Sequence, residues 1–369
     1  MKLVAVTTVT LWIMATTTAG WANTVKIVSW NMAPGLYEAV LDRAADMRNL
    51  DTALSPDVII LIEVAGINEV RFLAQSLGWP TWYAAVSDGM KLSTQTSTAI
   101  ETAVISKIPI EQVVEYDARP EGKWHPVMSS TRPEGDSAIP VTEVELSSRG
   151  IGGVAPMAGT DRGTMRVDLQ GGLSVFPIHL KSNLNGVCFD ARDAERLLRT
   201  LGLPALSALS TIQSSGDSAK AKEDALNAIK RERVIAAIKV VADEAALTRT
   251  VILAGDYNTS FEEGKAGASF KDCMLDPFSC TPAPFPSSAC NGDGYDDTFA
   301  ILTTPLVGST KWTVLSECLG RTYDDTAFAD KAIDHIAVPD AEKGHFSNLG
   351  KGNSTFGSDH FPIIVTFTP

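Results

Sequence analysis

Short apolar runs with the period of a β-strand recur along the whole chain. Val58 to Ile62 is apolar at every position, which indicates a fully buried strand, whereas Val25 to Asn31 alternates as a strand should. Glycine or proline bounds several of these runs, as is common at strand ends. The pattern predicts strands at residues 25–31, 58–62, 97–106, 141–146, 163–169, 173–179, 251–254, 331–338 and 361–367, with 107–110 continuing the third strand past Pro109.

Helical periodicity appears between some of the strands. Apolar residues from Val40 to Leu50 lie on one face of a helix predicted at 37–54, and two more helices are predicted at 68–77 and 219–247. We find no internal repeat and no clean linker. The pattern therefore predicts one α/β domain at residues 23–369, with insertions near 117–162, 183–218 and 262–330, which are rich in small, polar or loop-forming residues.

The segment Thr250 to Ser260 is the centre of the predicted chemistry. Its apolar run ends at Gly255, so Asp256 and Asn258 lie at the carboxyl end of a buried strand with their side chains on one side. A carboxylate can orient or deprotonate a water molecule while a neighbouring amide donates hydrogen bonds to a charged oxygen. The same two residue types also close turns, so this segment alone does not decide between the two interpretations.

Polar residues end or border most of the other apolar runs as well. Strand ends meet at one edge of a sheet, so we expect these side chains to converge on one pocket. Glu63 and Asp359 offer hard oxygen ligands for Mg²⁺, Mn²⁺ or Ca²⁺, and no cysteine or histidine pair has the spacing of a zinc site. The expected residues are Asn31, Glu63, His179, Asp256, Asn258, Asp334, Asp359 and His360.

The segments around these residues resemble, in the same order, the motifs of the endonuclease/exonuclease/phosphatase superfamily. This superfamily includes DNase I, abasic-site endonucleases and bacterial sphingomyelinases. The matching segments are Ser29–Met32, Leu61–Val64, Ile105–Ile110, His179–Ser182, Gly255–Asn258, Ile333–Ile336 and Ser358–Pro362. Together they frame nearly all of residues 23–369.

The resemblance implies a four-layer α/β sandwich, in which two mainly antiparallel sheets pack face to face with helices outside. It also implies metal-dependent hydrolysis of a phosphate ester, with Mg²⁺ the favoured ion and Mn²⁺ or Ca²⁺ as alternatives. Glu63, Asp359 and Asn31 would hold the metal, and Arg162 would bind the substrate phosphate. His179, Asp256, Asn258, Asp334 and His360 would form the catalytic group, with Asp334 as the partner of His360; which histidine is the base stays open.

Two positions depart from the family pattern. Ala33 stands where some abasic-site enzymes carry an aspartate, which weakens that particular assignment. Ala99 stands where relatives have a polar residue near the histidine, and Glu101, two residues later, would replace it if the strand carries a bulge. His335 follows Asp334 directly, so its side chain should point to the opposite face, where we expect a structural role.

The first 22 residues have the features of a secretory signal peptide. An apolar stretch from Leu3 to Ala15 is too short for a comfortable membrane span, and Gly20–Ala22 is a small-x-small cleavage site. We therefore expect a secreted or periplasmic protein, with an uncleaved anchor as the alternative. In that setting at least one disulfide is expected among Cys273, Cys280, Cys290 and Cys318, with Cys188 left over.

Composition restricts the substrate. The chain has 369 residues, 44% of them hydrophobic, and a formal net charge of −13, so it can bury a large core but repels polyanions at long range. Nucleic acid is the leading substrate: the acidic surface argues against tight non-specific nucleic-acid binding, but not against turnover at a site where a metal supplies positive charge. A phospholipid or small-molecule phosphodiester is the alternative, and a non-catalytic binding protein on the same scaffold is a third hypothesis. We expect a monomer without a stable membrane span.

Overall fold

The computed structural model describes residues 24–33, 40–87, 101–117, 127–129, 139–145, 164–180, 231, 234–235, 237–259, 298–303, 310–317, 319–324 and 332–369. The predicted signal peptide, Arg162 and the five cysteines lie outside these residues. Within the described part of the chain, no helix is long and apolar enough to cross a membrane.

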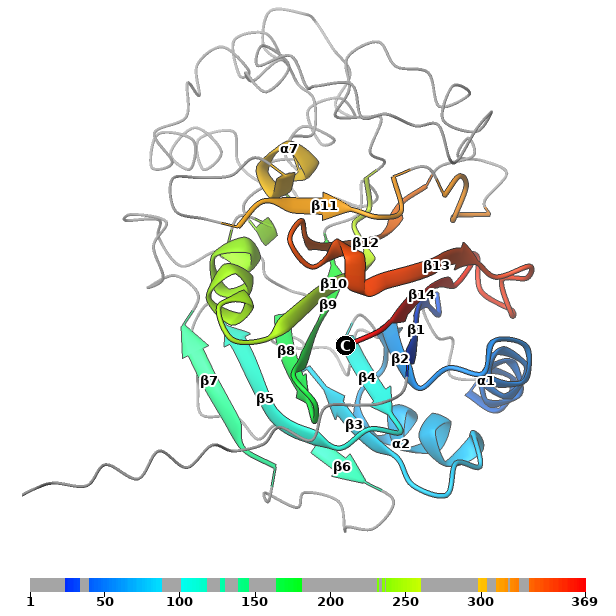
Figure 1. Ribbon diagram of the computed structural model, residues 1–369. Coiled ribbons are helices and arrows are strands. Elements are labelled where there is room, and N and C mark those ends of the chain that lie inside the picture. Colours follow the sequence, from blue (N-terminus) through cyan, green and yellow to red (C-terminus); the bar gives the residue numbers. More distant parts are fainter. Residues whose placement is uncertain are drawn as a thin grey trace, which may run out of the picture.

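Two seven-stranded sheets form the centre of the molecule (Figure 1). The first has the order β13 (Phe346–Lys351), β14 (Ile363–Phe367), β1 (Val25–Asn31), β2 (Val58–Val64), β4 (Glu101–Ser106), β3 (Tyr83–Val86) and β6 (Val127–Ser129). The second has the order β11 (Trp312–Val314), β12 (Asp334–Pro339), β10 (Thr250–Asp256), β9 (Leu173–His179), β8 (Thr164–Leu169), β5 (Ile110–Asp117) and β7 (Val141–Glu145). Among these strands only β1–β2, β9–β10 and β5–β7 pair in parallel, so the expectation of mainly antiparallel sheets is confirmed.

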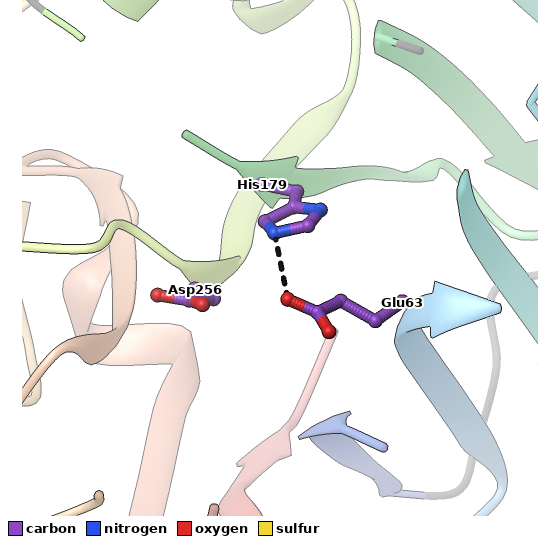
Figure 2. Close-up of side chains that lie close together, drawn as sticks. All are labelled: Glu63, His179 and Asp256. Atoms are coloured by element: carbon purple, nitrogen blue, oxygen red, sulfur yellow. Dashed lines mark ion pairs between the residues drawn. The ribbon is translucent and has the colours of Figure 1, made fainter. Parts of the chain in front are cut away.

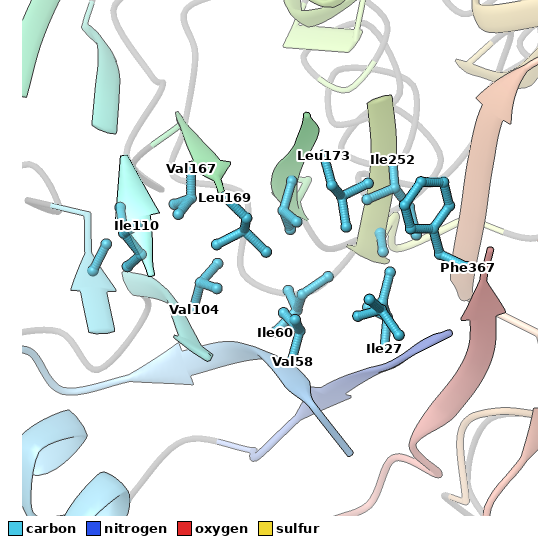
Figure 3. Close-up of a cluster of buried hydrophobic side chains, with 14 of the residues drawn as sticks. Ile27, Val58, Ile60, Val104, Ile110, Val167, Leu169, Leu173, Ile252 and Phe367 are labelled. Carbon is cyan, nitrogen blue, oxygen red and sulfur yellow. The ribbon is translucent and has the colours of Figure 1, made fainter. Parts of the chain in front are cut away.

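Alternation along the strands builds the core between the sheets. In β2 the side chains of Val58, Ile60 and Ile62 belong to the central cluster, where Ile252 of β10 and Val167 of β8 also lie (Figure 3). The intervening residues of β2 face the other way, so this strand is apolar at every position because both of its faces are buried. Removing this apolar surface from water is the main favourable contribution to folding.

Helices cover the outer faces. Helices α1 (Val40–Leu54) and α2 (Ile67–Ser76) pack against the first sheet through residues such as Met47 and Leu73, which share a cluster with Trp30. Residues 237–246 are helical and, with α7 (Thr298–Thr303), cover the second sheet. The order helix, sheet, sheet, helix is the predicted four-layer α/β sandwich, which is confirmed.

Some predictions about single elements were wrong. Residues 107–110 do not continue the preceding strand, because β4 ends at Ser106 in the first sheet and β5 begins at Ile110 in the second. Pro109 cannot donate to a sheet, and it lies in the connection that carries the chain from one sheet to the other. The sequence also gave no clear signal for β3, β6, β11 and β13; β6, β11 and β13 are edge strands, and β3 is a short strand next to an edge.

Gly255 is required by the close approach of β9 to β10. Its φ angle is +151°, and a Cβ atom at this position would overlap the backbone of Ile178 on the paired strand. We therefore expect Gly255→Ala to lower the free energy of unfolding by roughly 3 kcal/mol or more, measured by urea denaturation. Gly344→Ala is the control, because a Cβ at Gly344 meets nothing within 4 Å. Equal stability of the two variants would contradict this account.

Candidate active site

Strand alternation brings polar groups to one end of the space between the sheets. Ile252, Ala254 and Asp256 are alternate residues of β10, and the first two face the central core. The same alternation places Asn31 at the end of β1, His179 at the end of β9 and Asp334 at the start of the antiparallel β12 on the inner faces. The predicted convergence of these residues therefore follows directly from the sheet register.

Asp256 is the most tightly held of these side chains. It is buried, and its Oδ2 atom accepts from Asn31 Nδ2 and from Asn258 Nδ2, each at 2.9 Å. Its Oδ1 atom accepts from the backbone N–H of Asn258 at 2.7 Å. Asn258 adopts φ +53°, and its amide also donates to the Leu180 carbonyl at 2.9 Å. Three N–H groups thus fix the orientation of one carboxylate.

Glu63 reaches the site through a β-bulge. Simple alternation from Ile62 would point Glu63 away from the second sheet, but the register between β2 and β4 shifts between Ile62 and Val64, and Glu63 has φ +63°. Its Oε1 atom lies 3.3 Å from His179 Nε2 (Figure 2). A left-handed glutamate costs about 1–3 kcal/mol, and such strain is common at functional sites.

Glu63, His179 and Asp256 together form the candidate metal centre. One ligand atom from each of the three lies within 4.8 Å of the others, so a single ion fits among them. Two carboxylates and one imidazole suit Mn²⁺ as well as Mg²⁺. This set shares Glu63 with the ligands expected from the sequence.

His360 and Asp334 form a second pair at the same end of the sandwich. His360 Nδ1 lies 2.8 Å from Asp334 Oδ2, and both side chains are almost fully buried. The ring of Tyr323 contacts His360 edge-on, with ring centroids 4.8 Å apart. Because Nδ1 faces the carboxylate, Nε2 is the ring nitrogen left to act on a substrate.

Burial and neighbouring charges shift the pKa values of Asp256 and His360. Burial, assisted by the nearby Asp334 and Glu63 carboxylates, raises the pKa of Asp256 to about 7, although His360 and the Asn258 N–H oppose this shift. Burial by itself lowers the pKa of His360, but Asp334, Asp256 and Asp359 more than offset it and raise the pKa to about 10. The neighbouring carboxylates, Asp334 above all, therefore favour the protonated form of His360.

The other residues predicted from the sequence are placed as follows. Asp359 lies beside His360, with its Oδ1 atom 3.8 Å from Nε2, and its side chain is 41% exposed. Asn31 turns its Nδ2 group, not its oxygen, toward Asp256. Glu101 begins β4 opposite Val64, next to the bulge, and its carboxylate lies close to Gly66.

Several supporting residues were missed from the sequence. Thr322 Oγ1 accepts from the backbone N–H groups of Ile333 and Asp334 at 3.0 Å, which fixes the start of β12. Ser358 Oγ donates to the Asn31 carbonyl at 2.7 Å and ties the His360 loop to β1. Ser358 lies inside a recognised motif, so its position was a usable signal, whereas nothing in the sequence marks Thr322.

His335 is structural, as expected from its position after Asp334. It is fully buried on the outer face of the second sheet, with Nε2 2.9 Å from the Ala332 carbonyl and Nδ1 3.2 Å from Ser316 Oγ. The ring lies edge-on to Phe299. Burial lowers the pKa of His335 from 6.5 to about 4.

This shift predicts a pH dependence of stability. Because the folded pKa is the lower one, the contribution of His335 is complete above pH 6.5 and is lost as the pH falls toward 4, a loss of about 3 kcal/mol. In the His335→Gln variant, this part of the fall in the free energy of unfolding between pH 6.5 and 4 should be absent. The measurement is the free energy of unfolding at several pH values for both proteins, and parallel curves between pH 6.5 and 4 would refute the assignment.

Comparisons with known proteins give structural matches alone, since no family model and no curated protein matches the sequence. A 3′ phosphatase, NExo, from Neisseria bound to a product DNA hairpin is 17% identical over 94% of this chain and 100% of its own, with a TM-score of 0.48. An AP endonuclease from Archaeoglobus fulgidus is 13% identical over 93% and 99%, also with a TM-score of 0.48. A truncated Caenorhabditis elegans TDP2 is 13% identical over 94% and 98%, with a TM-score of 0.47.

The assignment of the architecture itself rests on the strand order, the register and the four layers described above.

Proposed function

We propose that this chain is a divalent-metal-dependent phosphodiesterase. The observation that carries the proposal is that Glu63, His179 and Asp256, which come from two different sheets, lie close together. One ligand atom from each of the three lies within 4.8 Å of the other two. A charged imidazole, His360, lies close enough to Asp256 to shift its pKa. Acidic metal ligands, a proton acceptor and a cation that lie close together are the groups that phosphoryl transfer requires.

The candidate centre fits a divalent ion by the chemistry of its donors. Two carboxylates and an imidazole nitrogen offer oxygen and nitrogen ligands without any thiolate, which favours Mg²⁺ or Mn²⁺. A bound ion would neutralise charge on the phosphate and on the leaving group. Asp359 and Asn31 stay predicted contributors to this site.

We assign the remaining roles from geometry. Asp256, held by three N–H donors, orients the attacking water and accepts its proton, with His179 beside it. His360, oriented by Asp334, presents Nε2 to the phosphate and stabilises its negative charge. Asn258, whose amide is fixed by Leu180 and Asp256, completes the set of donors around the reacting group.

Nucleic acid is the substrate we propose, since the superfamily that the motifs resemble includes DNase I and abasic-site endonucleases. The formal net charge of −13 favours a small or lipid phosphodiester instead, so the substrate needs a direct test. Plasmid DNA, RNA, sphingomyelin and bis-nitrophenyl phosphate should each be incubated with Mg²⁺ and with EDTA. Cleavage of DNA or RNA that EDTA abolishes supports the proposal, whereas hydrolysis of sphingomyelin alone would replace the substrate but keep the chemistry.

Inactivity toward all four substrates would favour the non-catalytic hypothesis. Against that hypothesis stands the complete set of polar groups, because a degenerate protein is expected to lose at least one of them.

Export of the mature chain from Asn23 also stays a proposal. N-terminal sequencing of secreted protein checks it, and a sequence beginning at Met1 would exclude cleavage.

A further inference from the structure

A chain of hydrogen bonds leads from helix α1 to the Asp256 carboxylate. Arg43 Nη2 donates to the Ala33 carbonyl from the first turn of α1. The backbone N–H of Ala33 donates to Asn31 Oδ1 at 2.9 Å, and Asn31 Nδ2 donates to Asp256 Oδ2 at 2.9 Å. The two ends of an amide differ, so the bond from Ala33 determines that Asn31 offers its donor end to Asp256.

Ala33 needs support from outside its own loop. Its φ angle is +60°, in the left-handed region that residues with a Cβ rarely adopt. With this φ angle the N–H group of Ala33 points at Asn31 while its carbonyl, in the next peptide unit, faces Arg43. A donor that binds the carbonyl therefore stabilises the backbone angles of Ala33, and these angles also set the direction of the N–H group.

Arg43 is unusual for a residue on the surface-facing layer. It is only 8% exposed, and its Nε and Nη1 atoms are buried without a hydrogen-bond partner among the described residues. Burying a guanidinium with unsatisfied donors is unfavourable, so stability alone does not explain its position. Its one recorded hydrogen bond in the described part of the chain is the one to Ala33.

We propose that Arg43 is a positioning residue that acts on Asp256 through Ala33 and Asn31. Without Arg43, the Ala33 peptide relaxes toward negative φ, the amide of Asn31 is free to rotate, and Asp256 loses one of its three N–H donors. Arg43 itself contacts neither the candidate metal ligands nor Asp256 in the described residues. Its effect should therefore fall on turnover and leave substrate binding almost unchanged; this expectation depends on the proposed phosphodiesterase activity.

The test is a double-mutant cycle with bis-nitrophenyl phosphate and Mg²⁺. Arg43→Met should lower kcat roughly 10-fold with KM changed by less than about 2-fold, which is the loss expected when one hydrogen bond to a charged group is weakened. In an Asn31→Ala background the same substitution should have no further effect on kcat, because the connection is already broken. Arg48→Met, at an exposed position of the same helix, is the matched control and should leave both constants unchanged.

Three results would overturn the inference: an unchanged kcat in Arg43→Met, a rise in KM as large as the fall in kcat, or an equal loss with and without Asn31. If Arg43→Met does not fold, Arg43→Gln replaces it in the same cycle, since its shorter side chain keeps a polar end but cannot reach Ala33.

A second readout separates this inference from the proposed function. Solvent exchange of the Asn31 side-chain amide, followed by NMR and assigned with Asn31→Ala, should be slow in the wild type because Nδ2 donates to a buried carboxylate. Arg43→Met should accelerate it, and Arg48→Met should not. Faster exchange in a protein that hydrolyses no phosphodiester would reject the proposed function and keep the Arg43 connection, whereas unchanged exchange in an active enzyme would reject the connection alone.

Discussion

Asp256→Ala and His179→Ala should each reduce turnover by roughly 100-fold or more while the protein stays folded. Asp256 accepts hydrogen bonds from three N–H groups, and His179 Nε2 lies 3.3 Å from Glu63 Oε1 of the opposite sheet. Both side chains are therefore held in fixed orientations at the candidate active site. Removing either takes away a group that acts on the attacking water or on the ion. The measurement is kcat on the best substrate from the panel, with circular dichroism to verify folding.

The double variant should lose much less than the product of the two single losses, because both groups serve one step. Asp340→Ala and His345→Ala are suitable controls. Asp340 lies just beyond the far end of β12 from Asp334, and His345 is exposed, so both variants should retain wild-type turnover. Folded Asp256→Ala and His179→Ala proteins with full activity would exclude the proposed mechanism.

Much of this site was accessible from the sequence because the period of a strand is two. Once Ile252 and Ala254 are known to face the core, Asp256 must face it too, at the point where the strand ends. The same reasoning places Asn31 and Asp334, and it correctly assigns His335 to the opposite face. The layered architecture could also be predicted, because β2 is apolar on both faces and each face must pack against another layer of the fold.

Glu63 is the residue for which this reasoning fails. Counting from Ile62 turns its side chain away from His179, and only the bulge with φ +63° returns it to the site. A bulge depends on pairing with β4, a strand more than thirty residues later, so local sequence does not encode it. The crossing from β4 to β5 is hidden for the same reason, because sheet membership is decided by long-range pairing.

The sequence predicted the contact between Asp334 and His360, but it could not predict the raised pKa of His360. The motifs indicated that the two residues meet, yet the raised pKa of His360 also depends on Asp256 and Asp359, which come from other parts of the chain. Thr322 and Tyr323 likewise reach the site from a segment without any motif. Such groups become visible only when the register and the loop contacts are known.

Chelation should abolish activity completely and reversibly. EDTA would remove the ion that Glu63, His179 and Asp256 are proposed to hold. Without it, the carboxylates of Glu63, Asp256 and Asp334 would lie near one another, and among the described residues His360 would be the cation beside Asp256. Adding Mg²⁺ or Mn²⁺ in excess should restore turnover, because these ions accept oxygen and imidazole ligands. The measurement is the rate of hydrolysis as a function of free metal concentration.

Variants then identify the ligands. Glu63→Gln should raise the metal concentration for half-maximal turnover by roughly 10- to 100-fold, and Asp359→Asn should do the same if Asp359 is the second carboxylate ligand expected from the sequence. Should Asp359→Asn leave that concentration unchanged while Glu63→Gln raises it, the site is the set of Glu63, His179 and Asp256. Glu111→Gln, at the exposed start of β5, is the control with no expected effect. Full activity in EDTA would eliminate the metal from the mechanism.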